Sequence, residues 1–265
     1  MKLAHSLRRA AALLLAVLVT NCGGGGGDAT PAPATTPRGP VPEADIALLF
    51  MGNSHTSANN LPGMVAAIVR ATRPGRTVRA VEAPGWMFLD ERSTHVPSVE
   101  LLREGGWNFV VLQAQKYSSS GLFDYPIDGA VSLARMARGV RAVPIMFPEW
   151  PRKDVDETQR IYNLHVSIAL REPACVAPVP QAWDIALARD PALVLHAPDG
   201  NHSAPAGALL AAMVIAATMT GVPPDQLGDI AEANVPAAVQ AKLRAAAAEA
   251  VRIHPPRQYC PGDSY

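Results

Sequence analysis

The sequence predicts an α/β fold, a three-layer α/β/α sandwich whose central parallel sheet has about five strands. Short apolar runs alternate with helical segments along the chain, and this order is typical of a parallel sheet between two helical layers. The run Ile46–Met51 is apolar at every position, as expected for a strand buried on both faces. Residues 44–265, about 220 in number, have a length that suits one domain of this kind.

Each predicted strand leads into a predicted helix. Strands are expected at 46–51, 77–81, 109–112, 140–147 and 175–179. Helices are expected near 60–72, 98–104, 127–138, 155–170, 204–220 and 236–252. Asn59 or Asn60 is the expected N-cap of the first helix, with Pro62 in its first turn. Right-handed crossovers then place the carboxyl ends of all the strands at one edge of the sheet.

Residues 1–22 have the pattern of a secretory signal peptide, with a basic start followed by a short apolar run. The run ends in Val19-Thr20-Asn21-Cys22, which resembles a bacterial lipobox, so we expect Cys22 to carry a lipid. Plain secretion with cleavage nearby is the alternative. Residues 23–43 are rich in glycine and proline and are expected to form a flexible tether. The expected location is the bacterial cell envelope, lipid-anchored in the periplasm or on the surface, or outside the cell after secretion.

Charge and cysteine content limit the expected partners. The 23 basic and 23 acidic residues balance, and no basic cluster contains interleaved aromatic residues, which argues against nucleic acid as a partner. No apolar stretch after the signal peptide is long enough to span a bilayer, so membrane contact is expected only through the N-terminal lipid. With Cys22 lipidated, Cys175 and Cys260 are left to form a disulfide in an oxidising compartment. Two free, buried thiols are the alternative.

Ser54 is the candidate nucleophile. It follows the first predicted strand, within Gly52-Asn53-Ser54-His55-Thr56, and open α/β sheets build their sites at the carboxyl ends of strands. Gly52 leaves room for a sharp turn that would hold Ser54 clear of the sheet. A serine hydroxyl needs a neighbouring base. His55 is poorly placed for that task, because adjacent side chains point apart.

A better base stands late in the chain, in Pro198-Asp199-Gly200-Asn201-His202. In a turn, the spacing of three residues can bring the Asp199 carboxylate to Nδ1 of His202 and leave Nε2 facing outward. Such an arrangement fixes the imidazole tautomer and stabilises the imidazolium that forms during attack.

Acyl transfer also needs hydrogen-bond donors for a developing oxyanion. The backbone N–H of Ser54 is one candidate. Gly85, after the second predicted strand, offers a second N–H that no side chain obstructs. Gln113-Ala114-Gln115, at the end of the third predicted strand, adds a side-chain amide.

These segments together resemble the signature of the SGNH (GDSL-like) hydrolases over about residues 44–222. The resemblance implies a flavodoxin-like SGNH fold with Ser54 as nucleophile, His202 as base and Asp199 as its orienting partner. Ser54, Gly85 and Gln115 would form the oxyanion hole. Asn53 stands where the family has Asp, and Gln115 where it has Asn.

The expected function is that of a serine esterase that hydrolyses carboxylic esters, with no cofactor or metal. Acetyl esters on carbohydrates are the favoured substrate class, and lipid or small aryl esters are the alternatives. Candidates for the substrate pocket are Asn53, His55, Gln113, Glu149 and Trp150. A catalytically inactive SGNH-like binding domain of the envelope is one alternative. A metal-dependent phosphoesterase is another, since Gly200-Asn201-His202 resembles a fragment of the dinuclear enzymes, although their other motifs are absent from the sequence. We interpret Gly262-Asp263-Ser264 as part of the tail.

Overall fold

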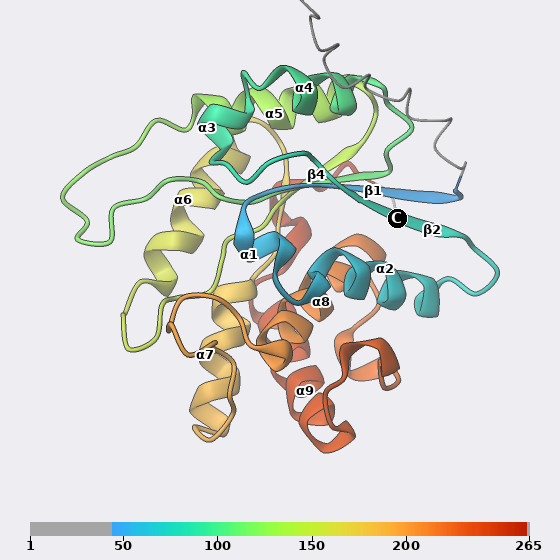
Figure 1. Cartoon of the computed structure of the whole chain (residues 1–265), viewed down its shortest axis with the longest axis vertical. Helices are drawn as coiled ribbons and strands as arrows, with labels where there is room; N and C mark the ends of the chain where they lie inside the picture. Colours follow the sequence, from blue (N-terminus) through green and yellow to red (C-terminus); the bar gives the residue numbers. More distant parts are fainter. Residues whose placement is uncertain (1–43, 264–265) are drawn as a thin grey trace, which may run out of the picture. The chain divides into compact units, whose positions relative to one another are not determined.

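The structure, a computed structural model, describes residues 44–263 (Figure 1). The expected signal peptide, the lipobox with Cys22 and the tether at 23–43 lie outside the described residues. Within the described part, a five-stranded sheet has the strand order β2-β1-β3-β4-β5, and every neighbouring pair is parallel. The predicted α/β class and parallel five-stranded sheet are therefore confirmed.

The strands are short and end at one edge of the sheet. Their bounds are Ile46–Met51 (β1), Val78–Glu82 (β2), Phe109–Leu112 (β3), Val143–Met146 (β4) and Cys175–Val176 (β5). Phe50 of β1 pairs with Glu82 of β2, and Met51 pairs with Leu112 of β3. The turns after β1, β2 and β3 therefore begin side by side.

Helices cover both faces of the sheet. The bounds are Ser54–Ser57 (α1), Leu61–Thr72 (α2), Leu89–Arg92 (α3), Val96–Arg103 (α4), Asp128–Gly139 (α5), Thr158–Arg171 (α6), Val179–Arg189 (α7), Pro205–Thr220 (α8) and Ala237–Ile253 (α9). One hydrophobic core joins α2, α7, α8 and α9 to one face, and a second joins α3, α4, α5 and α6 to the other. In Figure 1, α3, α4 and α5 lie on the opposite side of the sheet from α2, α8 and α9. Alternating residues of β1, such as Leu48 and Leu49, enter the two cores in turn.

Several boundaries differ from the prediction for identifiable reasons. Helix α7 was not predicted, and the strand expected at 175–179 overlaps its first residue; Pro180 lies in the first turn of the helix, where the missing N–H costs nothing. The strand expected at 140–147 is shorter because Arg141 has a positive φ of 63° in the turn before β4. Asn60 stands at the N-cap position of α2, but no side chain caps that helix.

Helix α8 forms the centre of one layer. All of its residues from Gly207 to Thr220 are buried. A Cβ atom at Gly207 would lie 2.2 Å from the Leu195 carbonyl oxygen and 2.3 Å from the Trp183 ring, so glycine lets the helix approach these groups. Among the described residues, no helix combines the length and apolar character that a membrane span needs.

Cys175 and Cys260 form a disulfide with a Cα–Cα distance of 5.0 Å. The bond joins β5 to the segment after α9, across a sequence separation of 85 residues. Both residues are buried. The bond therefore fixes the C-terminal segment to the edge of the sheet.

The free energy of unfolding should decrease as the pH falls from about 7 to 4. Burial lowers the pKa of His55 and of His165 to about 4. In the unfolded chain both imidazoles take up protons near pH 6.5, so each one favours unfolding progressively below that pH and has its full effect near pH 4.

The variant His165→Leu should reduce this loss by up to about 3 kcal/mol between pH 6.5 and 4. Urea unfolding of the variant and the wild-type protein at a series of pH values would measure this difference in the free energy of unfolding. Parallel pH curves for the variant and the wild-type protein would contradict the assignment.

Candidate active site

The segment that carries Ser54 makes a sharp turn at the end of β1. Helix α1 begins at Ser54, and the Asn53 side chain caps it by accepting the His55 N–H at 3.0 Å. A Cβ atom at Gly52 would lie 2.0 Å from Thr56 Oγ1 and 2.6 Å from Gln113 Oε1, so the turn can form only with glycine there. Asn53 therefore acts as a cap of this turn.

Gln113, directly after β3, supports the same turn through hydrogen bonds. Its Oε1 accepts the Asn53 N–H at 3.0 Å and the Thr56 hydroxyl at 2.8 Å. Its Nε2 donates to Glu149 at 2.7 Å, which fixes the orientation of the amide. Gln113 is fully buried, so it is a support of the turn and does not line an open pocket.

The segment from Ala197 to Ser203 is a tight hairpin that presents His202. Gly200, with a φ of 69°, makes the turn, and Asp199 Oδ1 accepts the N–H groups of Asn201 and His202, each at 2.9 Å. Asp199 Oδ2 lies 2.6 Å from His202 Nδ1. These hydrogen bonds, led by the one from the His202 side chain, hold the pKa of the Asp199 carboxyl well below its usual range.

The structure brings Ser54, His202 and Asp199 together. Ser54 Oγ lies 2.9 Å from His202 Nε2, although the two residues are 148 positions apart. The side chains of His202 and Asp199 are 34% and 51% exposed, so this group of residues is open to solvent. The three side chains are in the hydrogen-bonding order Ser–His–Asp, an arrangement that can remove a proton from a serine hydroxyl.

Two side chains fix the hairpin to the rest of the site. Trp150, after β4, donates its indole N–H to the Asn201 carbonyl oxygen at 2.8 Å. Asn59, beyond α1, donates to the Ser203 carbonyl oxygen at 2.8 Å. Trp150 is 1% exposed and stacks on Trp183. It therefore lies in the core and does not line an open substrate pocket, contrary to the expectation from the sequence.

His55 lies beneath the His202 ring. The two imidazoles stack with centroids 4.9 Å apart, and the centroids of the His55 and Trp150 rings are 5.2 Å apart in a tilted contact. Burial, and next the nearby His202, lower the pKa of His55 to about 4, so His55 is neutral at pH 7. His55 supports the His202 ring and presents little surface to a substrate.

Gly85 and Gln115, the candidate oxyanion donors in addition to Ser54, differ in their surroundings. Gly85, exposed after β2, has a φ of 77°, a conformation that favours glycine. The Gln115 amide nitrogen donates to the carbonyl oxygens of Lys116 and Pro126, both at 3.1 Å. Both of its hydrogens are therefore used within the loop after β3, which leaves none for an oxyanion at Ser54.

Glu149 lies three residues after β4 and, like Asn53 among the candidate pocket residues, keeps partial exposure. Loss of water around its carboxylate raises the pKa to about 7, although the hydrogen bond from Gln113 acts in the opposite direction. The carboxylate therefore titrates near neutral pH within two hydrogen-bond steps of the Ser54 turn.

Residues 44–263 contain one close group of side chains of the types that bind metal ions. The group that lies together there is Cys175, Cys260 and Asp263. The cysteines form the disulfide, and the Asp263 carboxylate accepts hydrogen bonds from Arg138 at 2.9 and 2.8 Å. These three residues are therefore already engaged with protein partners.

Solved structures provide the comparison with known proteins. A candidate SGNH hydrolase from Slackia heliotrinireducens is 26% identical, with a TM-score of 0.54, and the match covers 66% of this chain and 98% of that one. A DUF4886 family protein from Bacteroides uniformis is 13% identical, with a TM-score of 0.56 and coverage of 79% and 95%. TesA is 18% identical, with a TM-score of 0.45 and coverage of 66% and 98%. No protein-family model and no curated protein matches the sequence.

An open parallel sheet with a serine, histidine and aspartate at its carboxyl edge defines a hydrolase-like α/β protein. The chain is similar more narrowly to the SGNH hydrolases, since its fold is like that of the Slackia heliotrinireducens protein. This confirms the resemblance inferred from the sequence and supports a hydrolase of the esterase type.

Sequence reasoning missed three residues near the site. Arg92 contacts the turns after β1 and β2, Asn59 joins the Ser54 and His202 segments, and Trp86 stands exposed beside Gly85. Trp86 follows Gly85 directly, so its place in the chain was an available signal. The contacts of Arg92 and Asn59 form only in the folded chain, so no pattern in the sequence indicated them.

Gln113 and Gln115 should differ in their effect on activity. Gln113→Leu should lower kcat by about 10²-fold or more, because the Asn53 N–H and the Thr56 hydroxyl lose a buried acceptor at about 1–3 kcal/mol each. Gln115→Leu should lower kcat by less than about tenfold, whereas loss of an oxyanion donor costs about 10²–10³-fold. Steady-state kinetics on an acyl ester would measure both, and a larger loss for Gln115→Leu would reverse this assignment.

Proposed function

We propose that the protein is a serine esterase that hydrolyses carboxylic esters through an acyl-enzyme. The observation that carries the proposal is the hydrogen-bonding order of Ser54, His202 and Asp199, with distances of 2.9 and 2.6 Å. The likeness to a candidate SGNH hydrolase supports the same class of reaction.

In the proposed reaction, His202 Nε2 takes the proton of Ser54 Oγ as that oxygen attacks the ester carbonyl carbon. Asp199 keeps Nδ1 protonated and stabilises the imidazolium. The Ser54 and Gly85 N–H groups donate to the oxyanion of the tetrahedral intermediate. The intermediate expels the alcohol, which His202 protonates, and water then releases the acid by the same steps in reverse order.

We propose acetyl esters on carbohydrates as the substrate class. The exposure of His202 and Asp199 supports a bulky substrate, because an open site can admit a polymer. An acetyl group is small enough to bind without an apolar tunnel. Trp86, 69% exposed next to Gly85, supports the same class. Its indole N–H donates to Ser57 Oγ at 3.1 Å, which fixes a flat apolar surface beside the site. Lipid attachment at Cys22 and an envelope location belong to this proposal on the sequence alone.

Ser54→Ala should abolish hydrolysis of p-nitrophenyl acetate, with a loss of about 10⁴-fold or more in kcat. A fluorophosphonate probe should label Ser54 in the wild-type protein and nothing in the variant. EDTA should leave the rate unchanged.

Each alternative function has its own signature in the same assay. Loss of the rate on chelation would favour a metal-dependent phosphoesterase. A folded wild-type protein that neither turns over esters nor takes the probe would favour an inactive binding domain.

Trp86→Ala should raise KM for an acetylated oligosaccharide by about tenfold, because loss of a stacking surface costs about 1 kcal/mol or more. KM for p-nitrophenyl acetate should change by less than about twofold. Leu170→Ala is the matched control, since Leu170 is 71% exposed on α6. Equal effects of Trp86→Ala on both esters would contradict the proposed role of the ring.

A further inference from the structure

Arg92, the last residue of α3, is fully buried between the turns that follow β1 and β2. Its Nη2 donates to the carbonyl oxygen of Gly52 at 2.6 Å and to that of Gly85 at 2.5 Å. Its Nη1 donates to the Pro84 carbonyl oxygen at 3.2 Å and to Ser98 Oγ at 2.8 Å. One guanidinium therefore joins the turn that leads to Ser54 and the turn that contains Gly85.

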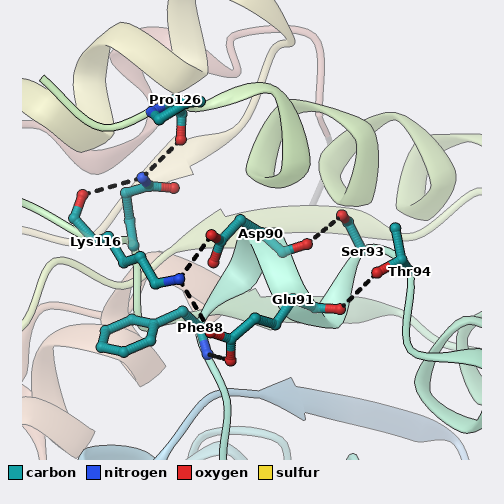
Figure 2. A network of polar contacts seen from close by, with 8 residues as sticks. Phe88, Asp90, Glu91, Ser93, Thr94, Lys116 and Pro126 are labelled. Carbon is teal, nitrogen blue, oxygen red and sulfur yellow. Dashed lines mark hydrogen bonds and ion pairs between the residues drawn. The ribbon is translucent and has the colours of Figure 1, made fainter. Parts of the chain in front are cut away.

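All of these acceptors are neutral. The nearest acidic residues in the chain, Asp90 and Glu91, instead pair with Lys116 at 2.8 and 3.0 Å (Figure 2). The Phe88 ring lies 5.0 Å from the same ammonium group. Within residues 44–263, Arg92 makes no ion pair. Burial lowers its pKa to about 10, so the guanidinium keeps its charge at neutral pH.

A buried cation without a carboxylate partner is costly for folding, since buried charges are normally paired. Four neutral acceptors reduce that cost, and within residues 44–263 no carboxylate pairs with the guanidinium to cancel its positive potential. This potential reaches the turns after β1 and β2, which carry the candidate oxyanion donors Ser54 and Gly85.

The contact with Pro84 has a specific geometric consequence. The Pro84 carbonyl and the Gly85 N–H belong to one planar peptide unit, in which the two groups point in opposite directions when the bond is trans. A cation that binds the carbonyl oxygen therefore directs the N–H away from Arg92. It also polarises the peptide unit, and hydrogen bonds in such chains strengthen one another by about 10–30% per bond.

We propose that Arg92 is a positioning residue of the oxyanion hole, which aims and polarises the Gly85 N–H and fixes its separation from Ser54. The inference rests on the proposed esterase function and deepens it. A purely structural brace would affect the stability of the fold. A residue that acts on the oxyanion hole also affects transition-state stabilisation, and the two roles are separable by experiment.

Arg92→Met should lower kcat for p-nitrophenyl acetate by about 10–100-fold, somewhat less than the loss of an oxyanion donor itself. KM should stay within about threefold, because the ester carbonyl carries little charge before attack. The inhibition constant of an alkylboronic acid, whose adduct with Ser54 is tetrahedral and negatively charged, should rise by the same factor as kcat falls. Arg92→Lys, which keeps the charge on one nitrogen, should show a smaller loss in both quantities.

Arg138→Met is the matched control, because it removes a partly buried arginine that is paired with Asp263 outside the site. It should lower the unfolding temperature and leave kcat and boronate affinity unchanged. A folded Arg92→Met protein with wild-type kcat and boronate affinity would overturn the inference, as would equal losses in Arg138→Met.

A structure of the wild-type boronate adduct tests the inference even if Arg92→Met does not fold. A boronate oxygen should accept the Gly85 N–H at hydrogen-bonding distance, and an adduct without this bond would overturn the role of Arg92. Failure of the proposed function looks different: the wild-type protein would then lack ester hydrolysis and fluorophosphonate labelling altogether.

Discussion

The position of β1 between β2 and β3 is the constraint on which the candidate site depends. Parallel pairing brings the last residues of these strands into register, so that three turns begin next to one another. Hydrogen bonds can then cross from turn to turn: Gln113 holds the Ser54 turn from β3, and Arg92 joins it to the turn after β2. An antiparallel neighbour would send its turn to the other end of the sheet and leave these side chains without acceptors.

The outline of the fold could be read from the sequence because buried strands and their following turns have local signatures. The bounds of β1 and β3 agree with the apolar runs, and the Asp199 and His202 spacing indicates a hairpin in which both side chains meet. Helix α7 was missed because the apolar residues before it extended the predicted strand as far as Val179, where the helix begins. The sequence signal was thus strongest where a single segment decides the structure.

The supporting residues of the site could not be predicted in the same way, because tertiary contacts decide their roles. Gln113 and Gln115 are two positions apart, and only the location of their hydrogen-bond partners shows which one reaches the Ser54 turn. Arg92 lies in a four-residue helix with acidic neighbours, a pattern typical of an exposed surface, and yet it is fully buried. Trp150 follows a strand at the expected edge, but its ring packs into the core.

The disulfide encloses the candidate base, His202, and leaves out the candidate nucleophile, Ser54. The ring closed by Cys175 and Cys260 contains α7, α8, α9 and the hairpin with His202, while Ser54 and its supporting turns precede it in the chain. In the chain-entropy description, closing a ring of this size lowers the entropy of the unfolded state by an amount worth about 4–5 kcal/mol. Cleavage by a thiol reductant would therefore lower the free energy of unfolding of the domain by a similar amount.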